Sequence, residues 1–281
     1  MFSTVIAASV RDEETIGEFS AFVVEVPIVD AESEFVVVSA RHCVTAAYGV
    51  GAKVVLRVPI QPEHIDPANP PYVWNTESIL VCGWAHDDNT DVSVAPLPLE
   101  CVPPNHFISS WTRGAFVGGP LQIFRDDVLI FGRGVLGDRG LVIRRRGALA
   151  THEAPFVSLE IEPNTFRSVR AYIVEANVTA GMSGGLVIWT NGAGLAENVA
   201  LGLVHGYAYS NRFAPPAWAH GVEDDAARDA FAKVQIEIEA ARNELVYVIP
   251  GGELLPLIDG VAVDAARARG NANAQVHPRL W

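Results

Sequence analysis

Short apolar runs rich in β-branched residues recur along the chain and are separated by turn-forming residues. Each run is shorter than a typical helix, and Gly, Pro, Asn, Asp or Ser residues lie between successive runs, a pattern that predicts strands rather than helices. The 24 Gly and 18 Pro among 281 residues suit many tight turns better than a helical bundle. We therefore expect an all-β protein. Six such runs lie in the first part of the chain: Thr4 to Val10, Phe19 to Val26, Phe35 to Ser39, Val54 to Pro59, Ile79 to Trp84 and Asp91 to Leu97.

A second group of strand-like runs follows a proline-rich crossing that contains Pro96, Pro98, Pro103 and Pro104. Because this group has more than six runs, we expect at least one pair to merge or to form an accessory hairpin. The predicted strands are Ala115 to Val117, Val128 to Gly134, Leu141 to Arg144, Phe156 to Ile161, Val169 to Ala176, Leu186 to Trp189, Ala200 to His205 and Glu244 to Pro250.

The charge balance limits which partners the chain can bind. A formal net charge of −13 argues against a nucleic-acid backbone or an anionic membrane surface as the main partner. The basic run Arg144 to Arg146 is an exception, which we interpret as a solvated strand end or loop. No run approaches the ~20 apolar residues that span a bilayer. Met1 to Thr4 lacks a basic start and Val5 to Val10 is too short for a secretory signal, so we expect a cytoplasmic protein.

A glycine-rich turn, Gly181-Met182-Ser183-Gly184-Gly185, precedes one of the predicted strands. Glycines on both sides let the backbone turn tightly and let a substrate approach the Ser183 hydroxyl closely. The amides of Gly181 and Ser183 can then point at one place, where a tetrahedral oxyanion could sit. A plain tight turn between strands is the alternative for this stretch alone.

A serine hydroxyl needs a base, and the chain offers a histidine and carboxylates elsewhere. His42 follows the apolar run that begins at Phe35, and Asp91 opens another apolar run. Asp87 and Asp88 lie close by, but they are typical of turn residues. A carboxylate that opens a buried strand is desolvated and can be directed at an imidazole, so we select Asp91.

Three motifs carry a resemblance to a known family: Thr/Ser-Ala-x-His-Cys read at Ser39 to Cys43, Asp-Val-Ser-Val at Asp91 to Val94, and Gly-x-Ser-Gly-Gly at Gly181 to Gly185. In this order the chain resembles the chymotrypsin-like (trypsin-fold) serine proteases, as a bacterial-type trypsin-like peptidase. The resemblance implies two antiparallel six-stranded β-barrels, with residues 1–105 carrying His and Asp and residues 106–258 carrying Ser. Residues 259–281 form a tail.

The same resemblance implies a mechanism for each motif residue. Ser183 attacks a peptide carbonyl, His42 transfers its proton, Asp91 orients His42, and the amides of Gly181 and Ser183 bind the oxyanion. The substrate is a protein or peptide, and neither a metal nor a cofactor is required. A catalytically silent trypsin-fold binding module and a partner-activated latent protease are the alternatives. An esterase-like acyl hydrolase would need strands alternating with helices, which the middle of the chain lacks.

Two residues depart from the family pattern near the active serine. Met182 replaces an Asp that, in zymogen-activated members, pairs with a newly cut N-terminus, so that switch cannot operate here. His205 occupies a place where many members have a Ser bonded to the catalytic Asp. With a one-residue shift it instead matches a pocket histidine of members that cleave after Glu or Gln. We rank the role beside Asp91 first.

The resemblance also assigns a pocket for the substrate side chain that precedes the cleaved bond. Its walls would contain Val204, His205, Gly206 and Leu245, and its base would contain Asn177. Because Asn177 replaces a charged Asp, and because Leu245 stands where Gly is frequent, we expect a small or uncharged substrate side chain.

A long insertion and a C-terminal segment complete the expected organisation. Residues 209–244 separate two pocket strands, and Glu223 to Asn243 predicts a helix. This helix is a lid, an exosite or a docking surface for a regulatory partner, or it only packs on the barrel. Gly251 to Ile258 predicts the family's short C-terminal helix, and we expect poor order from Ala265 onward.

The chain contains three cysteines, Cys43, Cys82 and Cys101. In secreted relatives the Cys after the catalytic His is paired with an earlier Cys, which is missing here. We therefore expect reduced, buried thiols in an intracellular protein.

Overall fold

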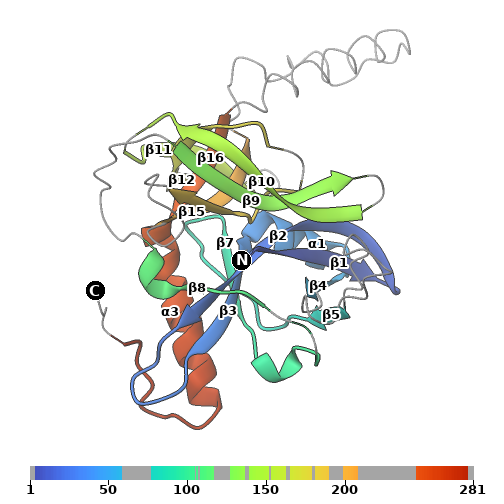
Figure 1. The fold of residues 1–281 in the computed structure, drawn as a ribbon, viewed down its shortest axis with the longest axis vertical. Helices are drawn as coiled ribbons and strands as arrows, with labels where there is room; N and C mark the ends of the chain where they lie inside the picture. Colours follow the sequence, from blue (N-terminus) through green and yellow to red (C-terminus); the bar gives the residue numbers. More distant parts are fainter. Residues whose placement is uncertain are drawn as a thin grey trace, which may run out of the picture.

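The computed structural model describes residues 4–58, 77–104, 106, 108–116, 127–136, 139–151, 153–162, 165–178, 181–189, 199–207 and 245–277. Two β units lie against each other, and one long helix runs along both of them (Figure 1). The all-β prediction is confirmed. The predicted helix from Glu223 to Asn243 lies outside the described residues.

The first unit is a sheet of eight strands that carries the region of His42 and Asp91. Its order is β5-β4-β1-β2-β3-β7-β6, and β8 pairs in parallel with β2. The described strands therefore form a larger sheet than the predicted six-stranded barrel, because the short β6 and β8 were not foreseen. The strands are β1 (Thr4–Arg11), β2 (Glu14–Val26), β3 (Glu34–Ala40), β4 (Lys53–Val58), β5 (Glu77–Leu80), β6 (Ala85–His86), β7 (Val92–Pro96) and β8 (Trp111–Thr112).

The second unit is a closed antiparallel barrel of six strands, as predicted for this half of the chain. Its order is β10-β13-β16-β15-β14-β9. Because these strands close into a barrel, they leave no sheet edge whose unpaired N–H and C=O groups could pair with another chain. The strands are β9 (Asp127–Leu136), β10 (Arg139–Leu149), β13 (Tyr172–Glu175), β14 (Leu186–Trp189), β15 (Val199–Tyr207) and β16 (Leu245–Pro250).

An accessory hairpin of β11 (Phe156–Glu162) and β12 (Thr165–Arg170) accounts for the excess of predicted strands. The predicted run Val169 to Ala176 divides at the buried Ala171, so that β12 joins the hairpin and β13 joins the barrel. The two described residues of the strand predicted from Ala115 to Val117 do not form a strand. Ala115 ends a 3₁₀-helix, η3 (Arg113–Ala115), and Phe116 makes an isolated bridge to Ala200.

The α-helices among the described residues are α1 (Arg41–Gly49) and α3 (Gly251–Ala268). The C-terminal helix is longer than predicted, and the expected poor order from Ala265 is wrong for the residues described. After α3, Ala274 is buried, Val276 bridges to Ile28, and the backbone N–H of His277 donates to Pro27. The apolar face of α3 explains this order, because it extends to Ala262 and Ala266 in the core.

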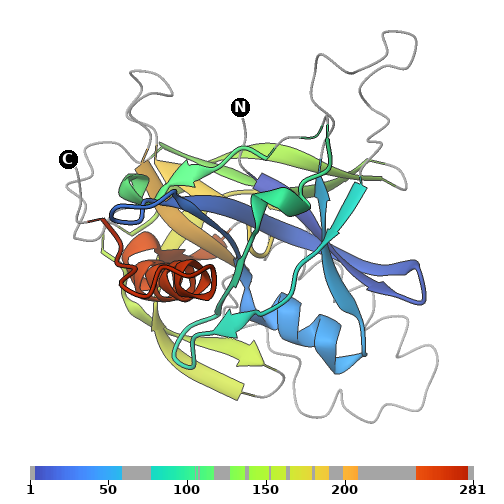
Figure 2. The same ribbon diagram turned by 90° about the horizontal axis from the view of Figure 1, so that it is seen from below.

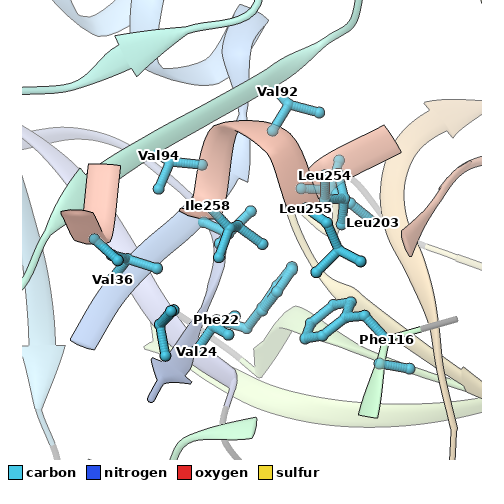
Figure 3. Close-up of a cluster of buried hydrophobic side chains, with 14 of the residues drawn as sticks. Phe22, Val24, Val36, Val92, Val94, Phe116, Leu203, Leu254, Leu255 and Ile258 are labelled. Carbon is cyan, nitrogen blue, oxygen red and sulfur yellow. The ribbon is translucent and has the colours of Figure 1, made fainter. Parts of the chain in front are cut away.

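One apolar core joins the two units and α3 (Figure 3). Phe22 of the first sheet stacks on Phe116 with ring centroids 6.0 Å apart, and Leu203 of the barrel and Leu254 of α3 are buried in the same cluster. In Figure 2, α3 is seen nearly end-on beside strands of both units. Because this core is shared, it fixes how the first sheet sits against the barrel, and the candidate site lies between them.

The three cysteines are free, as predicted, but they are not all buried. Cys82 and Cys101 are exposed and Cys43 is partly buried. Cys82 follows β5, which ends at Leu80, short of the predicted end at Trp84. Neither helix among the described residues combines the length and apolar character needed to cross a membrane.

Replacing Gly260 by alanine is expected to stabilise the protein by about 1 kcal/mol, because glycine is the poorer helix former inside α3. A Cβ at Gly260 meets no atom within 4 Å. The measurement is the urea midpoint with an unchanged m value. Gly251 of the same helix is the control, since a Cβ there meets Ala200 O at 3.1 Å. Equal gains at both positions would contradict the prediction.

Candidate active site

His42 lies in the first turn of α1, directly after β3 has crossed the sheet. The residue before the helix, Ala40, offers no side-chain cap for the free amides of this turn. Asp91 supplies one instead, because its Oδ1 accepts the backbone N–H of His42 at 2.8 Å. The backbone N–H of Arg41 donates to the carbonyl of Asp91 at 3.2 Å. The carboxylate thus holds the start of the helix that carries His42.

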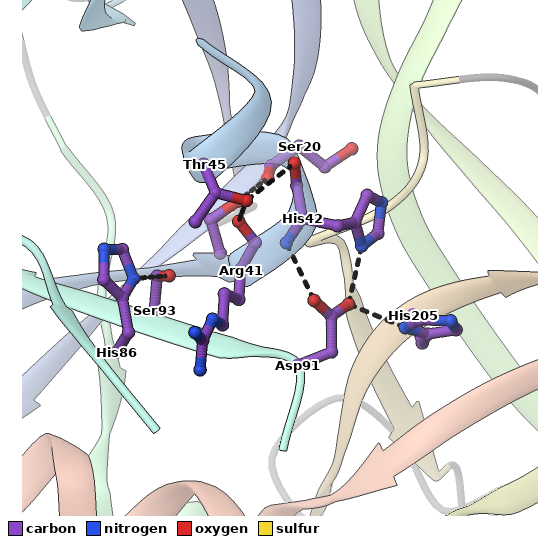
Figure 4. Close-up of polar contacts among 9 residues, drawn as sticks. Ser20, Arg41, His42, Thr45, His86, Asp91, Ser93 and His205 are labelled. Carbon is purple, nitrogen blue, oxygen red and sulfur yellow. Dashed lines mark hydrogen bonds and ion pairs between the residues drawn. The ribbon is translucent and has the colours of Figure 1, made fainter. Parts of the chain in front are cut away.

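Asp91 is fully buried just before β7, and it lies between two histidines (Figure 4). Its Oδ2 is 2.7 Å from Nδ1 of His42 and 2.6 Å from Nδ1 of His205. An ionised carboxylate only accepts hydrogen bonds, so both Nδ1 atoms carry a proton. This assigns the tautomer of His42: when the ring is neutral, its Nε2 has a free lone pair and can act as a base.

The neighbouring acidic residues are turn residues, as predicted. Asp87 Oδ1 accepts the backbone N–H of Asn89 at 2.7 Å, which closes a local turn. The side chain of Asp88 is 94% exposed and lies 3.5 Å from the guanidinium of Arg41. Of the three carboxylates considered from the sequence, Asp91 is the one hydrogen-bonded to His42.

His42 and Asp91 each stabilise the charged form of the other. Burial by itself would raise the pKa of Asp91, but the charge of His42 and hydrogen bonds from His205 and His42 outweigh it and hold that pKa below its ordinary value. Burial likewise opposes the charged form of His42. Interactions with Cys43 and with Asp91 outweigh it, so the pKa of His42 is well above 6.5. Asp91 therefore stays ionised and stabilises an imidazolium at His42.

The turn that contains Ser183 packs against the junction from which His42 emerges. Gly181 and Gly184 have φ values of 88° and 83°, in the region that favours glycine. A Cβ on Gly184 would lie 3.0 Å from the amide nitrogen of Ala40, two residues before His42. On its other side, the Gly184 N–H donates to Val204 of β15 at 2.8 Å. Ser183 is partly exposed.

His205 and Gly206 bring β15 to the same place. The rings of His42 and His205 are 5.3 Å apart, edge to face, and a Cβ on Gly206 would lie 3.8 Å from Ser183 Oγ. The pairing of β15 with β16 is irregular between Val204 and Gly206. A bulge of this kind re-aims a side chain, and here His205 faces Asp91. This geometry matches the first of the two roles considered for His205.

The other predicted residues are placed as follows. Met182 is buried in the barrel core, where an apolar side chain suits the site and a carboxylate would not. Val204 is buried in the same core, so its backbone and not its side chain meets the Ser183 turn. Asn177 and Leu245 are exposed. Their role in a pocket stays a prediction.

Two serines near the turn were not identified from the sequence. Ser20 and Ser39 are fully buried on β2 and β3, and Ser39 Oγ donates to the carbonyl of Ser20 at 2.8 Å. The sequence offered one indication, the hydroxyl of Ser20 within the largely apolar run Phe19 to Val26.

His42, Asp91 and His205 each offer an atom that could bind a metal, and these atoms lie within 4.8 Å of one another. Tetrahedral zinc holds neighbouring ligand atoms about 3.3 Å apart. The two Nδ1–Oδ2 distances of 2.6 and 2.7 Å are shorter and correspond to hydrogen bonds. The arrangement therefore fits protonated nitrogens facing a carboxylate better than a metal centre.

No family model matches the sequence, and no curated protein matches it. Among solved structures the chain is similar to the Rv3671c protease from M. tuberculosis. The active form has a TM-score of 0.48 and 19% identity over 90% of this chain and 77% of that one. The inactive form has a TM-score of 0.47 and 19% identity over 92% and 88%. An inactive Ser-to-Ala mutant has 0.45 and 18% over 99% and 89%.

Proposed function

We propose that the chain is a serine endopeptidase that cleaves protein or peptide substrates through a Ser183–His42–Asp91 triad and an acyl-enzyme intermediate. One observation supports this most strongly. The carboxylate of Asp91 is hydrogen-bonded to Nδ1 of His42. The turn that carries Ser183 packs against Ala40, two residues before His42. The tautomer, the burial of Asp91 and the partial exposure of Ser183 all suit a hydroxyl nucleophile activated by a general base.

In the proposed reaction Ser183 Oγ attacks the carbonyl carbon of the substrate while His42 Nε2 takes its proton. Asp91 then faces an imidazolium, which its charge stabilises. His42 returns the proton to the leaving amine, and the same steps with water release the acyl group. The amides of Gly181 and Ser183 hold the oxyanion, at about 3–4 kcal/mol for each donor in comparable sites.

His205 extends the proposed triad on the far side of Asp91. Its Nδ1–H supplies a second hydrogen bond to Oδ2 at 2.6 Å, which keeps the buried carboxylate ionised and fixes its plane. A hydrogen-bonded carboxylate that cannot rotate keeps His42 in one orientation. We therefore assign His205 a positioning role and no contact with the substrate.

The decisive experiment is the reaction of the purified protein with a serine-directed fluorophosphonate, followed by intact-mass measurement. We expect one adduct on the unaltered chain and none on Ser183→Ala, with peptide mapping to the Gly-rich turn. A folded protein that gains no adduct would contradict the enzyme proposal and favour the alternative, a catalytically silent binding module. Adducts of equal yield on Ser183→Ala would place the reactive group elsewhere.

The labelling rate is expected to rise with pH and to reach half of its plateau above pH 6.5. His42 must be neutral to accept the proton of Ser183, and its pKa is well above 6.5. The raised pKa of His42 also affects the stability of the fold: its contribution is present below about pH 6.5 and is lost as the pH rises through the folded-state pKa. For labelling, the measurement is the second-order rate from pH 5 to 10, corrected for hydrolysis of the probe. A midpoint at or below 6.5 would contradict this assignment.

A further inference from the structure

Ser20 uses its backbone N–H and its hydroxyl at the interface between the first sheet and the barrel. Its backbone N–H donates to the carbonyl of Ser183 at 3.0 Å. Its Oγ donates to the carbonyl of Gly181 at 2.7 Å and accepts the backbone N–H of Arg133 at 2.7 Å. Ser20 is fully buried, so water cannot replace these partners. One residue of β2 therefore holds both ends of the segment Gly181-Met182-Ser183.

The hydrogen bond to the Gly181 carbonyl matters because Gly181 is the most adaptable residue of the segment. Gly181 has a φ of 88°, and glycine adopts other φ values as readily. Met182 is apolar and buried in the barrel core, so it brings no charge that could pair with another group. The hydrogen bond from Ser20 Oγ fixes the direction of the Gly181 carbonyl, and with it the plane of the peptide unit between Gly181 and Met182. The backbone amides of Gly181 and Ser183, on either side of this peptide unit, are then held relative to each other.

We propose that Ser20 is a positioning residue, which keeps the Ser183 turn in the shape that binds the oxyanion without any activation cleavage. This inference rests on the proposed protease function and concerns how the same site is assembled. The hydrogen bonds to Ser20 come from the other unit of the fold, so the oxyanion site exists only while the sheet and the barrel are docked.

An ion-pair bridge lies next to Ser20 and ties the same elements together. The guanidinium of Arg133, on β9, lies 2.8 and 2.9 Å from Glu18 Oε2. Arg57, on β4, lies 2.9 Å from the other oxygen of Glu18. Glu18 is two residues before Ser20 on β2, and its side chain is largely buried. A desolvated carboxylate with two guanidinium partners holds β9 against β2, and it keeps the Arg133 amide within reach of Ser20.

The turn is closely packed against Ser20 and β9. A Cβ on Gly132 would lie 2.9 Å from Ser20 Oγ and 3.2 Å from Met182 Cα. A Cβ on Gly181 would lie 2.7 Å from Cδ of Arg133. These distances are shorter than ordinary van der Waals contact, so glycines are required at both places for the turn to approach β2 and β9.

The test is the second-order rate of fluorophosphonate labelling for Ser20→Ala. We expect a plateau about tenfold to a hundredfold lower, since losing one oxyanion donor costs 10²–10³-fold in comparable sites and here the donor is misplaced rather than removed. The pH midpoint should not move, because the His42–Asp91 pair is intact. A merely structural defect would instead lower the amount of protein that reacts and leave the rate of the folded fraction unchanged.

Two further variants make the result decisive. Ser9→Ala removes a buried hydroxyl from β1 of the same sheet and should label at the unaltered rate. Ser20→Cys keeps a weak donor and should recover part of the loss; it also decides the question if Ser20→Ala does not fold. A folded Ser20 variant that labels at the unaltered rate overturns this inference and leaves the protease proposal standing. A failure of the unaltered chain to label overturns both.

Discussion

Replacing Asp91 by asparagine is expected to lower the rate of fluorophosphonate labelling at neutral pH by about four orders of magnitude, the loss seen when the orienting Asp of such a triad becomes Asn. The buried carboxylate accepts three N–H groups: the backbone amide of His42 on Oδ1, and Nδ1 of His42 and of His205 on Oδ2. An asparagine has one accepting oxygen and one NH₂ group. Whichever way its amide is turned, at least one of these donors faces another donor.

The consequence for catalysis follows from the tautomer. If the NH₂ group faces His42, the Nδ1 atom must lose its proton, and Nε2 then carries one and cannot act as a base. If the NH₂ group faces away, it opposes the backbone N–H of His42 at the start of α1. A buried unsatisfied donor costs about 1–3 kcal/mol, so this arrangement also loosens the helix that carries His42.

The matched control is Asp88→Asn, in the same loop and with a side chain that is 94% exposed. It should label at the unaltered rate and unfold at the same urea concentration. Both variants lose one negative charge, so a difference between them measures the contacts of Asp91 and not the net charge. An Asp91→Asn protein that is folded and keeps more than a tenth of the labelling rate would contradict the proposed triad.

The proposed catalytic residues were predictable because each lies in a short local motif. His42 follows a strand, Asp91 opens one, and Ser183 lies between glycines. Chain order and residue type were enough to select them, and the structure brings all three to the seam between the two units. Most predicted strands are also present, since alternation and turn residues are local signals.

Features that depend on pairing between distant segments could not be predicted. The prediction for His205 depended on a one-residue shift, and the direction of its side chain toward Asp91 depends on the irregular pairing at Val204 and Gly206. Ser20 lies 161 residues from Gly181, and no spacing rule connects them. The end of α3 was missed for a similar reason: its last turns are held by a core that β2 and β3 share. Such positions are fixed by tertiary packing and not by propensity.

Replacing Gly184 by alanine is expected to destabilise the fold by about 2–5 kcal/mol. Two costs combine: overpacking, at about 1–3 kcal/mol, and a left-handed conformation, at about 1–2 kcal/mol for a residue with a Cβ. Gly184 has a φ of 83°. Its Cβ would overlap the carbonyl oxygen of Ser20 and would lie 2.5 Å from Ser39 Oγ. Neither neighbour can move easily, because Ser20 and Ser39 are buried and hydrogen-bonded to each other.

The control for this prediction is Gly51→Ala. Gly51 has a φ of 72°, close to that of Gly184, but a Cβ there meets nothing within 4 Å. Gly51→Ala should therefore lose only the conformational part, about 1–2 kcal/mol. Urea unfolding of the two variants separates strain from steric overlap, because the difference between them is the cost of pushing the Ser183 turn away from β2 and β3. Equal losses would mean that the turn yields freely. In that case the contact between Gly184 and Ser20 would not hold Ser183 beside His42, and the rigid seam on which the proposed mechanism depends would be absent.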